Sequence, residues 1–202
     1  MSKFVLHLPP QRYEAFIFDC DGTLVDSMPL HFAAWREAFG QFQAPFEFTW
    51  QLFQSRAGMG LEQTVRELNL QFATRLDPLA VVQAQVDASE RLLATVQAID
   101  PVARFAREVA AASPVSVASG GKRHHVARSL SVTGLDVLFP VVVTQEDVTR
   151  GKPDPEMFLL AAERMGVGPA QCLVIEDSPL GLEAAKAAGM GAAWVEHRQS
   201  GD

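Results

Sequence analysis

Asp19 and Asp21 form the most informative pair in the sequence, because they follow an apolar run and come just before Gly22. Side chains of a strand alternate with period two, so both carboxylates are expected on the same side where the strand ends. Two carboxylates at one point repel each other unless a proton, a cation or another partner offsets the charge. The pair therefore predicts a site for a hard divalent metal, with a carboxylate nucleophile and an acid/base beside it. A solvated turn is the alternative for this stretch taken alone, because Asp and Gly both suit turns.

Two other polar groups follow predicted strands further along the chain. Ser119 comes directly after an apolar run and before Gly120 and Gly121, so its hydroxyl and the backbone N–H groups of this turn could hold a small anion. Lys152 lies between turn-forming residues before a predicted helix, and the prolines beside it restrict the backbone. The alternatives are a plain turn for Ser119 and an exposed surface position for Lys152.

Glu176 and Asp177 repeat the acidic pair after another apolar strand, predicted over Cys172 to Ile175. The alternative for this pair is a helix N-cap, supplied by Asp177 or Ser178. In a doubly wound sheet the carboxyl ends of the strands share one crevice. The joint occurrence of a nucleophile, an anion-binding hydroxyl, a cation and metal ligands at such ends favours a catalytic site over a set of independent turns.

The elements that must position these residues alternate along most of the chain. Strands are predicted over residues 14–19, 115–118, 139–143, 172–175 and 192–195, with helices up to about 112, after 121, over 155–165 and over 180–188. This alternation predicts an α/β fold with a doubly wound parallel sheet and right-handed crossovers.

A helical block interrupts the alternation after the first strand. Its apolar spacing predicts one helix ending near Gly40, a second around residues 61–70 and a third over 79–93. We therefore expect a catalytic core of residues 1–27 plus 97–202 and an inserted helical domain of residues 28–96. The insertion leaves the carboxyl end of the first strand, where such sheets bind ligands, so a lid is expected.

The composition excludes several classes of protein. The chain has 202 residues, is 48% hydrophobic and carries a net charge of −7 without a basic run, which argues against nucleic-acid binding and an anionic membrane surface. The first ten residues do not resemble a signal peptide, and no later stretch is apolar for long enough to span a membrane. Cys20 and Cys172 lie in apolar, strand-like segments, so we expect reduced core residues in a cytoplasmic protein.

The stretches around these residues, taken together, carry a family resemblance. The sequence resembles the haloacid dehalogenase (HAD) superfamily, and within it the β-phosphoglucomutase-like sugar-phosphate phosphatases with a helical cap. The resemblance covers residues 14–194. The run that begins at Asp19 and continues as Cys-Asp-Gly-Thr-Leu-Val-Asp-Ser matches the first motif of the family. Ser119 falls at the second motif, Lys152 in Gly-Lys-Pro-Asp-Pro at the third, and Glu176-Asp177 at the fourth.

The resemblance implies a Rossmann-like core and a role for each motif residue. Asp19 would attack phosphorus and form a phosphoaspartate, while Asp21 would act as general acid and then as general base. Mg²⁺ would be held by Asp19, the backbone carbonyl of Asp21 and Asp177, with Glu176 directly or through water. Lys152, Ser119 and Gly120 would hold the substrate phosphate. Asp21 favours phosphate-ester chemistry, since the dehalogenase branch is expected to carry a non-acidic residue there.

The choice between phosphatase and mutase depends on the helical domain. The mutases of this subgroup have an arginine shortly after a cap glycine, and the corresponding stretch here, Gly58-Met59-Gly60-Leu61-Glu62, has none. This departure favours a phosphatase over a β-phosphoglucomutase. The phosphatase would act on a small phosphorylated metabolite, and hexose phosphates such as fructose 1-phosphate are the first candidates. Gly58, Met59 and Glu62 are candidate substrate contacts. His31 is another, although a helix residue packed on the core is the alternative.

A third possibility is a non-catalytic regulatory protein that keeps the fold. The presence of Asp19, Asp21, Lys152 and Asp177 together argues against it. A monomer is expected by analogy with capped members of the family.

Overall fold

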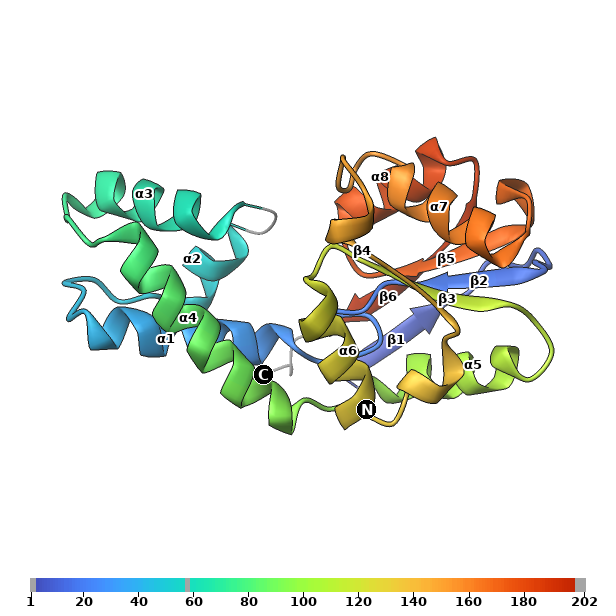
Figure 1. Ribbon diagram of the computed structural model, residues 1–202, viewed down its shortest axis with the longest axis horizontal. Helices are drawn as coiled ribbons and strands as arrows, with labels where there is room; N and C mark the ends of the chain where they lie inside the picture. The colour runs from blue at the N-terminus through green and yellow to red at the C-terminus, as the bar shows by residue number, and fades with distance from the viewer. Residues whose placement is uncertain (1–2, 57–58, 199–202) are drawn as a thin grey trace. The chain divides into compact units, whose positions relative to one another are not determined.

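Six strands form one sheet in this computed structural model, which describes residues 3–56 and 59–198. The strands are β1 (Phe4–His7), β2 (Ala15–Phe18), β3 (Val115–Ser119), β4 (Val141–Thr144), β5 (Cys172–Glu176) and β6 (Gly191–His197). They lie in the order β1-β6-β5-β2-β3-β4 (Figure 1). β2 pairs in parallel with β3 on one side and with β5 on the other. The first strand of the predicted alternation therefore lies in the middle of the sheet, at the point where the strand order reverses.

Helices cover both faces of this sheet. The helices are α5 (Asp100–Ala110), α6 (Arg123–Val132), α7 (Glu156–Met165) and α8 (Pro179–Ala187), with 3₁₀ turns η2 (Asp136–Leu138), η3 (Gln145–Asp147) and η4 (Pro169–Gln171). Figure 1 shows α5 and α6 on one face and α7 and α8 on the other. This arrangement confirms the predicted α/β, doubly wound architecture.

The alternation of β2 explains why helices pack on both of its faces. Ala15 and Ile17 belong to a buried cluster with residues of α7 and α8. The alternate residues Phe16 and Phe18 contact the ring of Phe105 on α5, with centroids 5.5 and 6.1 Å apart. Both faces of the strand are thus apolar, and its carboxyl end is held from both sides.

The edge strand β1 was not predicted. It pairs antiparallel with β6, so the sheet is mixed rather than wholly parallel. Other differences are small: β4 begins at Val141 rather than near Phe139, since Pro140 has no N–H for a sheet ladder. Cys172 lies in β5 as expected, but Cys20 lies in the loop after β2; both are free, buried thiols.

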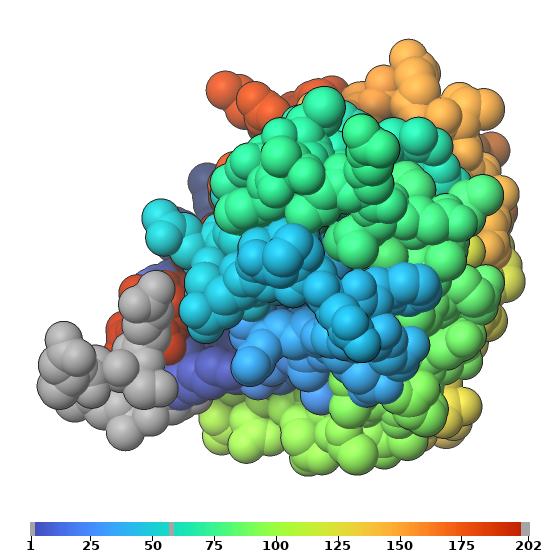
Figure 2. Space-filling model, turned by 90° about the vertical axis from the view of Figure 1, so that its left-hand side faces the viewer, coloured from blue at the N-terminus to red at the C-terminus, as the bar shows by residue number. Residues whose placement is uncertain are grey.

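The chain divides into two compact units, Met1–Asp26 with Val96–Asp202, which holds the sheet, and Ser27–Thr95. The second unit is helical and consists of α1 (Met28–Gln41), α2 (Trp50–Gln54), α3 (Leu61–Phe72), α4 (Pro78–Leu92) and η1 (Leu93–Thr95). Its own core is aromatic, with Trp35, Phe39 and Phe48 buried together beside Leu68. Figure 2 shows the side chains of this unit closely packed, in blue to green. That it acts as a lid stays a prediction.

None of the helices in the described ranges is long and apolar enough to cross a membrane.

Candidate active site

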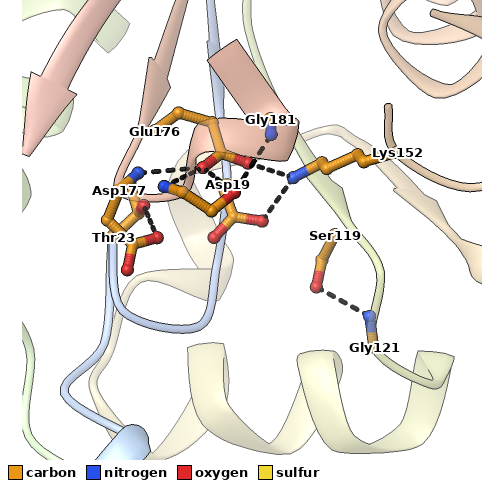
Figure 3. A network of polar contacts seen from close by, with 9 residues as sticks. Asp19, Thr23, Ser119, Gly121, Lys152, Glu176, Asp177 and Gly181 are labelled. Atoms are coloured by element: carbon orange, nitrogen blue, oxygen red, sulfur yellow. Dashed lines mark hydrogen bonds and ion pairs between the residues drawn. The ribbon is translucent and has the colours of Figure 1, made fainter. Parts of the chain in front are cut away.

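Asp19 lies directly after β2, the central strand, and its side chain is buried (Figure 3). Its backbone N–H donates to the carbonyl of Ile175 at 3.0 Å, which continues the pairing of β2 with β5 by one residue. Its carboxylate oxygen Oδ1 accepts a hydrogen bond from Lys152 Nζ at 2.7 Å. The chain turns at residues 20–24, so the period-two argument that placed Asp19 and Asp21 on one side of a strand does not extend to Asp21.

Lys152 joins two carboxylates that come from different strand ends. Its Nζ donates to Asp19 Oδ1 at 2.7 Å and to Glu176 Oε1 at 2.5 Å, and it lies 5.0 Å from the centre of the Phe158 ring. Its side chain is only 11% exposed, which excludes the surface alternative. Burial would lower the pKa of Lys152, but the charges of Asp19 and Glu176 outweigh it and raise the pKa above its ordinary value. The lysine is therefore a fixed positive charge at this site.

Glu176 is the last residue of β5 and is fully buried. Its Oε2 accepts hydrogen bonds from the backbone N–H of Asp177 at 2.9 Å, the backbone N–H of Ser178 at 2.7 Å and the Ser178 hydroxyl at 2.9 Å. Gly181 packs against it so closely that a Cβ there would lie 1.9 Å from Oε1. Ser178 is the N-cap of α8, and its hydroxyl oxygen accepts from the Gly181 N–H at 3.0 Å. Ser178 is therefore the helix N-cap that was the alternative for this stretch, and it lies next to the buried carboxylate of Glu176.

Asp177 faces the loop that follows β2. Its Oδ1 accepts a hydrogen bond from the Thr23 hydroxyl at 3.0 Å. Gly22 has a φ of +85°, and a Cβ on it would lie 2.3 Å from Asp177 Oδ2, so only glycine allows this approach. Burial and then the charge of Glu176 raise the pKa of Asp177 to about 6, against the opposing effect of His197. Asp177 is thus a buried carboxylate next to a second one, with a pKa above its ordinary value.

Three carboxylates meet at this point, with ligand atoms of Asp19, Glu176 and Asp177 all within 4.8 Å of one another. With the ammonium of Lys152 they carry a formal charge of −2 when all are ionised. Burial, and the charges of Glu176 and Asp177, also raise the pKa of Asp19 well above its ordinary value, against the attraction of Lys152. Such a set of hard oxygen donors with an unbalanced double negative charge fits a divalent cation such as Mg²⁺.

Ser119 and Asp21 both lie next to Gly121. Ser119 is the last residue of β3, and its hydroxyl oxygen accepts from the Gly121 N–H at 3.1 Å, which leaves the hydroxyl proton able to reach an anion. A Cβ on Gly121 would lie 3.3 Å both from Asp21 Oδ2 and from Ser119 Oγ, so the carboxylate and the hydroxyl border the same small space. Next to it, Gly120 faces open space.

The structure brings the predicted residues of the core together and adds others that had no assigned role. Thr23 lies within the first motif and could have been suspected from that position. His197 had no such signal, since it ends a strand far along the chain. Its Nε2 lies 2.6 Å from the Gly22 carbonyl oxygen and 3.4 Å from Asp177 Oδ2.

The candidates in the helical domain belong to the second unit and are described within it. His31 is half-buried on α1, and Glu62 is exposed on α3, where it pairs with Arg66 at 3.2 Å. The backbone N–H of Met59 donates to the carbonyl of Arg56 at 3.0 Å. Gly58 lies outside the described residues. Roles of these residues in substrate recognition stay predictions.

Comparison with known proteins identifies the family. Residues 13–189 match the family model of haloacid dehalogenase-like hydrolases, and the chain belongs to this family. It is similar to the fructose-1-phosphate phosphatase YqaB of Escherichia coli, with 34% identity over 92% of this chain and 97% of the relative. It is also similar to a phosphorylated carbohydrates phosphatase of Thermotoga maritima, with 32% identity over 88% of this chain and 82% of the relative.

Solved structures give the same result for the fold. A haloacid dehalogenase-like protein from Agrobacterium tumefaciens superposes with a TM-score of 0.76 at 28% identity, covering 89% of this chain and 81% of that one. A hydrolase from Pseudomonas syringae superposes with a TM-score of 0.71 at 27% identity, covering 89% and 83%. The family predicted from the motifs is thereby confirmed.

Proposed function

We propose that this chain is a Mg²⁺-dependent phosphatase that hydrolyses small phosphomonoesters, with hexose phosphates such as fructose 1-phosphate as the first candidates. The observation that carries the proposal is the carboxylate of Asp19, fixed at the end of the central strand by Lys152 and beside Glu176 and Asp177. The similarity to relatives named as phosphatases of phosphorylated sugars supports the reaction and the class of substrate.

Asp19 is the nucleophile in this proposal. Its carboxylate oxygen attacks phosphorus, the bond from phosphorus to the substrate oxygen breaks, and a phosphoaspartate forms. Asp21 gives its proton to the departing oxygen and then takes one from the water that hydrolyses the phosphoaspartate. The position of Asp21 next to Gly121 and Ser119, outside the cluster of three carboxylates, is consistent with a separate proton-transfer role.

The remaining polar groups would stabilise the phosphoryl group. Lys152 is charged and already in contact with Asp19, so it reduces the repulsion between that carboxylate and an approaching phosphate. The Ser119 hydroxyl and the Gly120 backbone N–H would donate hydrogen bonds to the anion. Asp19, Asp177 and the Asp21 carbonyl would hold Mg²⁺, with Glu176 directly or through water. When bound, Mg²⁺ supplies positive charge against the oxygens of the transferring group.

The helical unit favours a phosphatase over a β-phosphoglucomutase, although the chain is also 26% identical to a β-phosphoglucomutase of Bacillus subtilis. The stretch from Gly58 to Glu62 contains no arginine. Arg56 donates to Gln71 Oε1 and to the Leu52 carbonyl, and Arg66 pairs with Glu62, so both nearby arginines have partners inside this unit. Neither of them is in register with the mutase arginine, so a bidentate grip on a second phosphate has no counterpart in this stretch.

The test is release of inorganic phosphate from a panel of sugar phosphates with Mg²⁺, with β-glucose 1-phosphate plus a bisphosphate primer included. We expect rapid release from a few hexose phosphates, and its loss in Asp19→Asn. The matched control is Asp136→Asn, the same substitution at an exposed carboxylate on η2, which should keep wild-type turnover. Glucose 6-phosphate with little free phosphate would instead identify a mutase. Turnover by Asp19→Asn at the wild-type rate would exclude Asp19 as nucleophile.

Lack of turnover on every phosphomonoester, together with tight binding of a protein partner, would support the regulatory alternative. The cytoplasmic location and the monomeric state stay predictions.

A further inference from the structure

The strand pair β1–β6 brings a histidine to the candidate metal site from outside the family match. The match ends at residue 189, whereas β6 runs from Gly191 to His197. His197, its last residue, places Nε2 2.6 Å from the carbonyl oxygen of Gly22 and 3.4 Å from Asp177 Oδ2. Both neighbours belong to the motifs that build the site. His197 therefore contacts two parts of the candidate metal site, the Gly22 carbonyl and the Asp177 carboxylate.

The chemistry of these neighbours fixes the tautomer of His197. A carbonyl oxygen can only accept a hydrogen bond, and an ionised carboxylate can also only accept. Nε2 must therefore carry a proton that it donates to the Gly22 carbonyl, with Asp177 Oδ2 as the nearest other acceptor. This N–H therefore lies between a carbonyl oxygen, which carries a partial negative charge, and a carboxylate oxygen.

The imidazole of His197 is also contacted by β1. Phe4 is paired with His197 in the antiparallel register, and its ring meets the imidazole edge-on, with centroids 5.0 Å apart. The Arg198 N–H donates to the Lys3 carbonyl at 2.8 Å, and Lys3 Nζ pairs with Asp26 at 2.8 Å. β1 thus ties the end of β6 to the segment that follows the first motif.

The Gly22 loop and the Asp177 side chain contact each other so closely that neither can move without the other. There is no room between Gly22 and the Asp177 carboxylate even for one carbon atom, and Thr23 hydrogen-bonds the other oxygen of the same carboxylate. A group that fixes the Gly22 carbonyl therefore also fixes the direction in which Asp177 points. Second-layer partners of this kind commonly change metal affinity 10- to 100-fold when they are removed.

We propose that His197 is a positioning residue, which holds the Gly22 carbonyl and the Asp177 carboxylate in the orientation that the divalent cation requires. This inference rests on the proposed function only for the presence of a Mg²⁺ site. The strand pair β1–β6 is then part of the active-site support of this chain.

The test compares His197→Phe and His197→Gln with the wild-type protein. Phe keeps an aromatic ring against Phe4 but removes both ring nitrogens, whereas Gln restores an N–H donor at a similar distance from the backbone. The matched control is His7→Ala, which removes an imidazole from the same strand pair. His7 alternates with Phe4 along β1 and pairs instead with Glu196, so it lies on the opposite face.

Mg²⁺ binding to the metal-free proteins is measured by isothermal titration calorimetry, and the Mg²⁺ concentration for half-maximal phosphatase activity is measured separately. We expect His197→Phe to raise the Kd for Mg²⁺ about tenfold or more, His197→Gln to recover most of the affinity, and His7→Ala to match the wild type. The loss of activity in His197→Phe should be larger at limiting than at saturating Mg²⁺.

An unchanged Kd for Mg²⁺ in His197→Phe would overturn the inference. If that variant also unfolds at a lower urea concentration than the wild type in EDTA, the role of His197 is structural only. Equal losses in His197→Phe and His197→Gln would overturn it too, since the donor would not matter. A wild-type protein that binds no Mg²⁺ would overturn the metal site of the proposed function first and this inference with it. That outcome differs from failure of the inference alone, in which the wild type binds Mg²⁺ and His197→Phe binds it equally well.

Discussion

Gly181→Ala should disable the site although residue 181 is proposed to touch neither substrate nor metal. Gly181 lies in the first turn of α8, where alanine is ordinarily the better helix former by up to about 1 kcal/mol. Here a Cβ would lie 1.9 Å from Oε1, 2.0 Å from Cδ and 2.6 Å from Cγ of Glu176. Contacts this short cannot be absorbed by small shifts, and Glu176 is buried, so its carboxylate must leave its place.

The displacement has a cost that follows from the partners of Glu176. Its carboxylate accepts from Lys152 and from three donors of Asp177 and Ser178. Breaking a buried ion pair on one side costs about 3–5 kcal/mol. Subtracting the gain in helix propensity leaves a net loss of about 2–4 kcal/mol in the free energy of unfolding. For a chain of this size that corresponds to a fall in Tm of roughly 4–16 °C.

Urea and thermal unfolding would measure the loss in the free energy of unfolding of Gly181→Ala. Turnover at saturating Mg²⁺ should also fall by roughly 10²-fold or more, because Lys152 loses one of the two carboxylates that hold it. The matched control is Gly40→Ala on α1, where a Cβ meets nothing within 4 Å, so this variant should be as stable as the wild type or slightly more stable. If Gly181→Ala behaved like Gly40→Ala, the close packing of Glu176 against α8 would not be what holds Lys152 in place.

Three further predictions concern the metal, an ion pair away from the site and the helical unit. EDTA should abolish turnover and lower the Tm, and excess Mg²⁺ should restore both, with about 2.7 kcal/mol of stabilisation at one hundred times the Kd; activity that survives EDTA would contradict the metal site. Burial tends to raise the pKa of Asp147, but hydrogen bonds from Thr144 and Arg164 and the charge of Arg123 lower it to about 2. The ionised Asp147 carboxylate therefore adds about 1 kcal/mol to the free energy of unfolding, a value reduced by the solvent around the arginines. This stabilisation is complete above about pH 4 and is lost as the pH falls toward 2. The stability gap between wild type and Asp147→Asn in urea should narrow below pH 4, and a gap independent of pH would refute the assignment. Met59→Ala should change the ratio of kcat/KM between sugar phosphates more than it changes turnover of a generic phosphoester, and equal losses on all substrates would argue against a specificity role.

Most residues of the candidate site could be predicted because their positions depend on one topological rule. Asp19 and Glu176 come at the ends of strands whose residues are almost wholly apolar, and parallel strands with helical crossovers must end on the same side of the sheet. Lys152 could be added because it lies in a loop stiffened by prolines.

The parts that could not be predicted depend on contacts between distant segments. β1 lies at the edge of the sheet, and its partner β6 comes from the other end of the chain. The position of His197 follows from that pairing and from the path of the loop at Gly22, so nothing near His197 in the sequence indicates it. The use of both Glu176 oxygens also depends on how closely Gly181 approaches, which the sequence pattern of α8 does not specify.

The arrangement at Glu176 suggests how the site divides its carboxylates between two tasks. Glu176 accepts from four donors, including Lys152, so its negative charge is already compensated by the protein. Burial and the neighbouring carboxylates raise the pKa of Asp19 well above its ordinary value and that of Asp177 to about 6, so the negative charge of these two carboxylates is compensated less. A divalent cation gains most where negative charge is least compensated. Asp19 and Asp177 therefore offer the stronger attraction for Mg²⁺, and Glu176 serves mainly to hold Lys152 against Asp19.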